Sequence, residues 1–273
     1  MQVDVEKVLA DKAPKLAKKL PRFLIRYLKK IVHQDEINHI MGHYGQMEPY
    51  EFIHNALEFM GVSWHIVGME NIPKDGRYLF ASNHPFGGMD GIILASEVIA
   101  HLGDVRSISN DILMVLEPLA PILLPVNKHG AQSRVAAEIF ENTFASNTPI
   151  QTFPAGLCSR RIKGKITDLE WKTNFVKKAI QHNRHIVPVH FEGRLSNRFY
   201  NIYRFRQIFG IKANIEMLYL VDEMFRQRGK DFEVRIGTPI SPEELQAVGN
   251  PRQQTEYVRA KSYALAPNAA EGK

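Results

Sequence analysis

Cysteine is nearly absent from the 273-residue chain, in which Cys158 is the single thiol. One thiol excludes an intramolecular disulfide framework and fits a reducing compartment. Long hydrophobic runs are also missing, since no uncharged apolar stretch approaches the roughly 18 residues of a membrane-spanning helix. Lysines interrupt the first apolar stretch throughout, so we expect no signal peptide. These absences predict a soluble or membrane-peripheral protein.

Apolar content is sufficient for a substantial core, because 44% of residues are hydrophobic and 10% aromatic. Runs typical of strands occur at 62–67, 77–82, 105–109, 122–126, 149–153, 185–191 and 232–236. Helical patterns occur at 91–102, 130–146, 172–182 and 196–208, and Ser241-Pro242 begins another. The stretch 213–228 fits a strand or a helix equally. This alternation predicts an α/β fold, a mostly parallel sheet flanked by helices.

The first 33 residues carry nine basic and three acidic side chains, an excess equal to the +6 charge of the whole chain. One apolar stripe recurs there at helical spacing: Leu16, Leu20, Phe23, Leu24, Tyr27, Leu28 and Ile31. Such a helix packs its stripe on a protein core or lies in an anionic membrane interface, and both interpretations remain open. Nucleic acid is not expected, because stacking aromatics and a known motif are missing.

Three regions are expected from this pattern. Residues 1–60 form a basic amphipathic helical segment, with breaks at Pro14, at Pro21 and around 42–45. Residues 61–266 form the α/β domain, and residues 267–273 form a frayed tail.

The stretch 83–91 concentrates residues suited to chemistry. His84 follows a predicted buried strand, Gly87 and Gly88 come next, and Asp90 precedes a helical pattern. Imidazole titrates near neutral pH, and a carboxylate can fix its tautomer for general-base action. The glycines permit close backbone approach to a ligand, and the start of a helix offers free N–H groups to an oxyanion.

Three further predicted strands end in polar turns. One ends at Lys128, another continues into Phe153-Pro154-Ala155-Gly156 and Ser159-Arg160-Arg161, and the third ends at His190. Active sites of open α/β sheets gather at the carboxyl ends of strands. We therefore expect these turns to meet the His84 turn.

These four segments, in this order, resemble the sequence blocks of the lysophospholipid (glycerolipid) acyltransferase superfamily, and the resemblance covers about residues 62–240. The form of the first block is most similar to the hemolysin-like branch, which includes bacterial O-acyltransferases of amino-acid lipids. The resemblance implies His84 and Asp90 as catalytic residues. It implies substrate binding by Asn83, Gly87, Gly88, Lys128, Phe153, Pro154, Gly156, Ser159, Arg160 and Arg161.

The chain departs from the superfamily pattern in three places. Five residues rather than four separate His84 from Asp90, so the turn must bulge. Ala155 replaces the glutamate of the third block, and Leu157-Cys158 replaces its Thr-Arg pair. Lys128 stands for the arginine of the second block, or that arginine is absent. Loss of a carboxylate and a bidentate arginine disfavours glycerol 3-phosphate as acceptor.

The resemblance implies transfer of a fatty acyl group from an acyl-carrier-protein or CoA thioester to a lyso-lipid hydroxyl, with no further cofactor and no metal. His84 would remove the hydroxyl proton, and Asp90 would orient the ring. We expect a cytoplasmic protein on the inner face of the membrane, bound through residues 1–33. The basic run 160–178 suits an acidic carrier protein, a membrane surface or plain solvation.

Several alternatives stay open. The same His–Asp pair could serve a thioesterase or lipid hydrolase, although no G-x-S-x-G turn occurs. A non-enzymatic, hemolysin-like peripheral protein is a second alternative. Cys158 beside arginines could act as a thiolate nucleophile. His39 and His43 raise the question of zinc, but no HExxH pattern supports them.

Overall fold

The computed structural model describes residues 2–12, 14–126 and 134–267. Seven strands form one sheet in the order β1-β9-β8-β2-β5-β3-β4. Their bounds are Ser63–Val67 (β1), Tyr78–Ser82 (β2), Arg106–Asn110 (β3), Leu123–Val126 (β4), Ile150–Thr152 (β5), His185–Phe191 (β8) and Asp231–Ile236 (β9). Neighbouring strands are parallel except β8 and β9. The predicted α/β class with a mostly parallel sheet is confirmed.

Strand β2 lies at the centre of the sheet between β5 and β8, and all five of its residues are buried. A strand covered on both faces reads as one apolar run, which is why the sequence showed it clearly. Phe80 belongs to a core cluster on one face, whereas Leu79 and Ala81 belong to a second cluster on the other. This alternation follows from the two-residue period of a strand.

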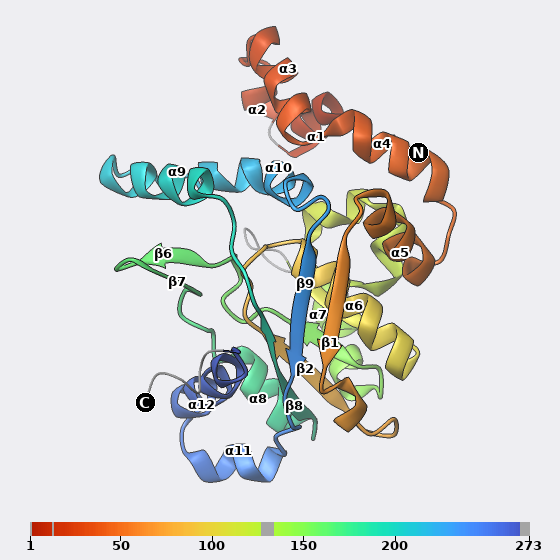
Figure 1. Cartoon of the computed structure of the whole chain (residues 1–273), viewed down its shortest axis with the longest axis vertical. Helices are drawn as coiled ribbons and strands as arrows, with labels where there is room; N and C mark the ends of the chain where they lie inside the picture. Colours follow the sequence, from red (N-terminus) through yellow and green to blue (C-terminus); the bar gives the residue numbers. More distant parts are fainter. Residues whose placement is uncertain (1, 13, 127–133, 268–273) are drawn as a thin grey trace.

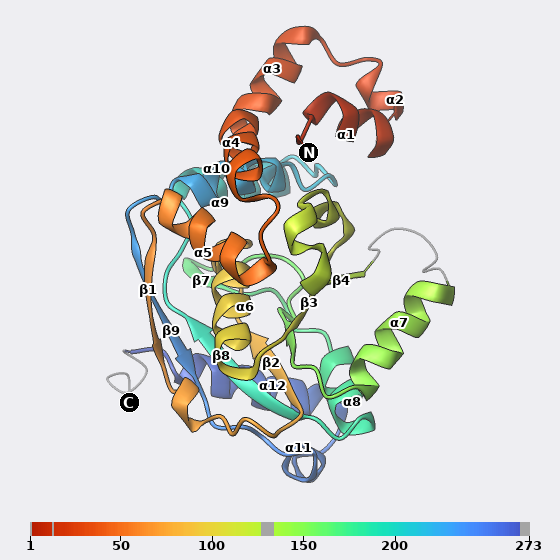
Figure 2. The ribbon, with the colours of Figure 1, turned by 90° about the vertical axis from the view of Figure 1, so that its right-hand side faces the viewer.

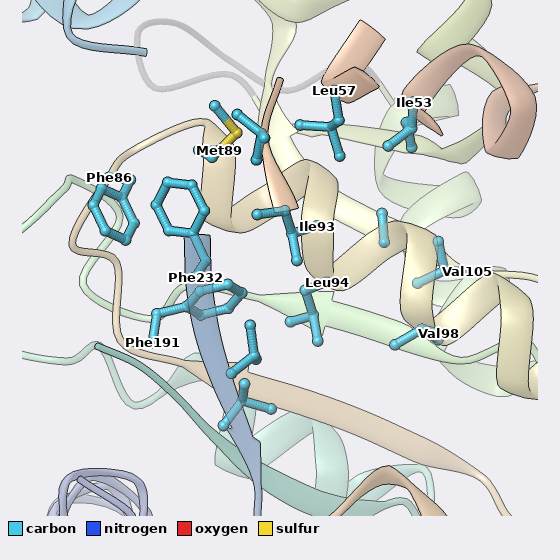
Figure 3. Close-up of a cluster of buried hydrophobic side chains, with 14 of the residues drawn as sticks. Ile53, Leu57, Phe86, Met89, Ile93, Leu94, Val98, Val105, Phe191 and Phe232 are labelled. Atoms are coloured by element: carbon cyan, nitrogen blue, oxygen red, sulfur yellow. The ribbon is translucent and has the colours of Figure 1, made fainter. Parts of the chain in front are cut away.

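Helices cover both faces of the sheet. On one side, α5 (Pro49–Phe59) and α6 (Met89–Leu102) supply Leu57, Ile93 and Leu94 to the first cluster, part of which Figure 3 shows. On the other side, α8 (Asn174–Gln181) and α12 (Pro251–Ala264) supply Phe175 and Val258 to the second cluster. The result is a three-layer arrangement, visible in Figure 2. Further helices are η1 (Met69–Asn71), η2 (Asp111–Val115), η3 (Glu117–Ile122), α7 (Arg134–Ala145) and α11 (Pro242–Val248).

The N-terminal residues form α1 (Val5–Lys12), α2 (Pro14–Ala17), α3 (Arg22–Ile31) and α4 (Gln34–Tyr44). Breaks fall at the predicted prolines and at Gly45, and an unpredicted one falls at His33, which has a left-handed φ of 50°. Ile40 of α4 and Ile53 of α5 join the same core as the sheet. Helices α1–α3 lie beyond that core, at one end of the molecule (Figure 1).

The ambiguous stretch after residue 212 is helical. It forms η4 (Ile215–Tyr219) and α10 (Leu220–Phe225), which follow α9 (Asn197–Ile208). The sequence did not predict a short antiparallel hairpin, β6 (Arg160–Ile162) with β7 (Lys165–Thr167). Each of its strands has three residues, too few to show a hydrophobic period.

Candidate active site

His84 and Asp90 meet where β2 ends and α6 begins. His84 Nδ1 lies 3.0 Å from Asp90 Oδ2, with the Asp90 side chain fully buried and that of His84 15% exposed. An ionised carboxylate only accepts hydrogen bonds, so Nδ1 carries the proton and Nε2 has a free lone pair. Within the described residues no hydrogen-bond partner lies on Nε2. The pair therefore presents one unoccupied basic nitrogen.

The Asp90 carboxylate is also held by the backbone. It accepts hydrogen bonds from the N–H groups of Phe86 (3.0 Å), Gly87 (3.3 Å) and Gly91 (3.0 Å). The extra residue of the turn is accommodated at Gly87, whose φ of +73° is left-handed. A Cβ at Gly87 would lie 2.8 Å from Leu220 Cδ1, so this position needs glycine for both conformation and space.

The third sequence block lies against the His84 turn. The rings of His84 and Phe153 stack at 4.1 Å between centroids, and the Ser159 N–H donates to His84 O over 2.8 Å. Stacking limits rotation of the imidazole and covers one of its faces. Phe153 and Ser159 therefore contact the His84 turn, and their role in binding substrate stays a prediction.

Gly87, Gly88 and Gly156 differ in the hydrogen bonds of their backbone N–H groups, and this difference decides which of them can hold an oxyanion. The Gly87 N–H donates to Asp90, and the Gly156 N–H donates to Phe153 O over 2.8 Å. Among the described residues, no acceptor is found for the N–H of Gly88, the N-cap of α6. An N–H at a helix start favours negative charge. Gly88 is therefore the best placed of the three.

Asn83 bonds to the protein rather than facing the open site. Its side-chain amide donates to Phe191 O (2.9 Å), and its Oδ1 accepts from the Phe191 N–H (2.7 Å). These two bonds tie the ends of β2 and β8 together just before His84. Asn83 therefore fixes the end of the strand, and its predicted contact with substrate stays a prediction.

The predicted head-group role of Arg160 does not fit its surroundings. Its side chain is fully buried, and it pairs with Glu216 at 3.0 Å and donates to Cys158 O at 2.5 Å. Arg206 Nε approaches the other oxygen of Glu216 at 2.9 Å. A buried arginine held in this way is not available to a ligand. Sequence reasoning could not find Glu216, which lies 56 residues further along the chain.

The structure describes one of the two other cations that were predicted to bind substrate. The half-buried Arg161 donates to Asn197 Oδ1 over 2.6 Å, at the start of α9. Lys128 lies outside the described residues.

Cys158 is fully buried, and burial raises the pKa of its thiol to about 11 although Arg160 acts in the opposite direction. Such a thiol stays protonated near neutral pH, which argues against the thiolate alternative.

Sequence reasoning missed Asp168. Its Oδ1 accepts from the backbone N–H of His84 (3.2 Å) and from Ser159 Oγ (2.6 Å), and its Oδ2 accepts from Trp171 Nε1 (2.8 Å). Asp168 is buried. Its hydrogen bonds join the first sequence block, at His84, to the third, at Ser159. The only sign of this role in the sequence was that a carboxylate, Asp168, follows shortly after the third block, in which Ala155 replaces the usual glutamate.

Among the described residues, no group of three or more His, Cys, Asp or Glu side chains is arranged to hold a metal ion. In the same residues, no helix has the length and hydropathy required to cross a bilayer.

Comparisons with known proteins show the family to which the chain belongs. Two curated relatives, from Bacteroides thetaiotaomicron and Phocaeicola vulgatus, are each named lyso-glycine lipid O-acyltransferase. Each is 46% identical over 264 residues, which cover 96% of this chain and 97% and 95% of the relatives. The crystal structure of the 1-acyl-sn-glycerophosphate acyltransferase PlsC from Thermotoga maritima shares the fold, with a TM-score of 0.51 at 14% identity and coverage of 92% and 93%. A family model described as Acyltransferase matches residues 7–272, and the chain therefore belongs to the acyltransferase family.

Proposed function

We propose that this acyltransferase transfers a fatty acyl group from a thioester to the hydroxyl of lyso-glycine lipid. The observation that carries the proposal is the free Nε2 of His84, presented by the bond between Nδ1 and the buried Asp90. The name shared by two relatives at 46% identity supports the choice of acceptor.

The reaction needs one proton carrier. His84 Nε2 removes the proton of the acceptor hydroxyl as that oxygen attacks the thioester carbonyl carbon. The carbonyl oxygen gains negative charge, which the Gly88 N–H at the start of α6 is placed to stabilise. The intermediate then collapses, the carbon–sulfur bond breaks, and the thiolate takes the proton back from His84. Asp90 stabilises the imidazolium that exists between these steps.

The third block supports an acceptor other than glycerol 3-phosphate. Ala155 supplies no carboxylate, and Arg160 is paired with Glu216 inside the protein. A phosphate monoester is best held by a free arginine fork, which neither residue offers.

The donor is proposed to be a thioester of CoA or of an acyl carrier protein. Exposed Lys163 and Lys165 on the β6–β7 hairpin give either acidic donor a cationic approach. We also propose that the protein works at the cytoplasmic face of the membrane, held there in part by residues 1–33.

The test is an acceptor panel assayed with purified protein and radiolabelled acyl-CoA or acyl carrier protein. We expect diacylated glycine lipid to form faster than the products of lysophosphatidate or lyso-ornithine lipid. Preference for lysophosphatidate would overturn the choice of acceptor. Release of free fatty acid at the same rate with and without acceptor would instead indicate the hydrolase alternative.

A further inference from the structure

The end of α9 and the adjoining η4 expose four large apolar side chains. Phe205, Ile208, Phe209 and Leu218 are 51%, 68%, 64% and 51% exposed, and we name these four residues the α9 patch. The rings of Phe205 and Phe209 lie 4.3 Å apart, so the patch is continuous along the helix. Figure 1 shows α9 extending away from the sheet, below α2 and α3. Grouped exposed apolar residues on a projecting helix indicate an interaction surface.

An open groove runs between α9 and η4 beside the patch. Its volume is about 670 Å³. Its lining residues are Arg198, Asn201, Ile202, Phe205, Ile215, Leu218 and Tyr219. Most of these present carbon atoms, as a site for a hydrocarbon chain requires.

The charged side chains exposed at the end of α9 are cationic. Residues 197–215 contain three arginines and a lysine, and the acids that follow, Glu216 and Asp222, are paired with Arg206 and Arg198. Arg206 is buried and forms an ion pair with Glu216, whereas Arg204 and Lys212 are exposed next to the patch. Apolar side chains inserted between exposed cations are typical of segments that lie in an anionic membrane interface.

Buried ion pairs and apolar packing connect the α9 patch to the turn that carries His84. Arg160 and Arg206 both pair with Glu216, which fastens α9 and η4 to the third sequence block. Leu220, directly after η4, packs against Gly87. Whatever binds the patch is therefore held at a fixed position relative to His84.

Helix α3 adjoins this surface. Tyr27 Oη lies 3.0 Å from Tyr219 Oη, and Phe23 and Tyr27 are exposed on α3. Ile31, by contrast, is buried. The N-terminal stripe thus packs partly on the protein and leaves Phe23 and Tyr27 exposed, with Tyr27 in contact with Tyr219, the residue after Leu218 of the α9 patch.

We propose that the α9 patch enters the interface of a bilayer that contains anionic lipid, with the groove seating a lipid chain there. This proposal rests on the proposed function, because a lyso-lipid acceptor resides in a membrane. It adds a second docking element to the basic N-terminal segment and determines which face of the enzyme meets the lipid.

The test compares vesicle binding and catalysis in three proteins. In the patch variant, Ile208→Ser and Phe209→Ser are combined, because neither residue lines the groove. The control variant, Val135→Ser with Ile139→Ser, removes equally exposed apolar side chains from α7. Binding is measured by co-sedimentation with phosphatidylcholine vesicles with and without phosphatidylglycerol. Activity is measured on lyso-glycine lipid in detergent micelles.

We expect the affinity of the patch variant for phosphatidylglycerol vesicles to be about tenfold or more below that of wild type. The reason is that the variant lacks large apolar side chains that wild type buries in the bilayer. The control variant should bind like wild type, and micellar activity should stay within about twofold in both variants. Equal binding by patch variant and wild type, or an equal loss in the control, would overturn the proposal. Absence of micellar activity in wild type would contradict the proposed function and leave the binding comparison intact.

Discussion

At the residue scale, the carboxylate of Asp90 accepts four hydrogen bonds, one from His84 and three from backbone N–H groups. These bonds hold the carboxylate in place, and its bond to Nδ1 fixes which nitrogen of His84 carries the proton. Asp168 also positions His84, because it accepts hydrogen bonds from the backbone N–H of His84 and from the hydroxyl of Ser159. The general base is thus positioned through both its side chain and its backbone.

Asp168→Asn is predicted to lower kcat about tenfold or more with little change in KM. One of the donors at His84, Ser159 or Trp171 would then face an amide N–H group instead of an oxygen, so the base would lose its position. Loss of a buried hydrogen bond of this kind costs about 1–3 kcal/mol of unfolding free energy. Steady-state kinetics and urea unfolding provide the measurements. Wild-type kcat in a destabilised Asp168→Asn would show that the residue is structural only.

Burial of the Cys158 thiol predicts that the free energy of unfolding depends on pH. Its thiol has a pKa of about 11 in the folded protein because it is buried, against 9.0 ordinarily. The unfolded chain therefore releases the proton first, and the thiol's contribution to stability, complete below pH 9, is lost between about pH 9 and 11. Relative to Cys158→Ser, wild type should lose about 1–3 kcal/mol of unfolding free energy over that range. Equal pH dependence in the two proteins, or rapid alkylation of the native thiol at neutral pH, would contradict this account.

At the scale of elements, the strands were predictable and several connections were not. All seven predicted strands occur in the sheet within one or two residues of their expected bounds, because their apolar residues form runs or recur at every second position. The β6–β7 hairpin was missed because each of its strands has only three residues, too few to show a hydrophobic period. Asp168 was missed because only the fold brings its partners His84 and Ser159 to it.

Gly87 allows a prediction about the turn that links β2 to α6. Gly87→Ala places a side chain in a left-handed conformation and against Leu220, whereas Gly103→Ala has the same kind of φ, +86°, with nothing within 4 Å. Left-handed backbone costs a non-glycine residue about 1–3 kcal/mol. We expect both variants to lose stability in thermal unfolding and only Gly87→Ala to lose most of its kcat. Equal kcat values in the two variants would mean that the bulged turn tolerates a side chain.

At the scale of the whole molecule, charge is concentrated at one end. The first 33 residues account for the net charge of +6, and their helices α1–α3 lie at the end of the molecule nearest α9 and α10 (Figure 1). Arg204 is exposed on α9. The sequence indicated the basic segment but not the α9 patch, because a helical period in 196–208 does not reveal which face stays uncovered. Three-dimensional packing alone shows that α9 projects from the body.

Binding of the full-length protein to phosphatidylglycerol vesicles is predicted to weaken as salt rises. Exposed charges are screened within about 8 Å at physiological ionic strength and within about 3 Å at 1 M. Each basic residue near an anionic surface contributes about 1 kcal/mol, which is about fivefold in binding, so the loss should be tenfold or more but incomplete, with the apolar patch retaining part of the binding. Co-sedimentation across a salt series measures it, and binding that rises with salt would exclude an electrostatic contribution.

The central claim is that His84, oriented by Asp90, is the general base for acylation of a lyso-lipid hydroxyl. The most direct measurement is kcat/KM for acyl transfer to lyso-glycine lipid in wild type, His84→Ala and Asp90→Asn, with circular dichroism to verify folding. General-base catalysis contributes about 10²–10⁴-fold, so we predict losses of that size in both folded variants, and free thiol and diacyl product falling together. Full acyl transfer by a correctly folded His84→Ala protein would contradict the account.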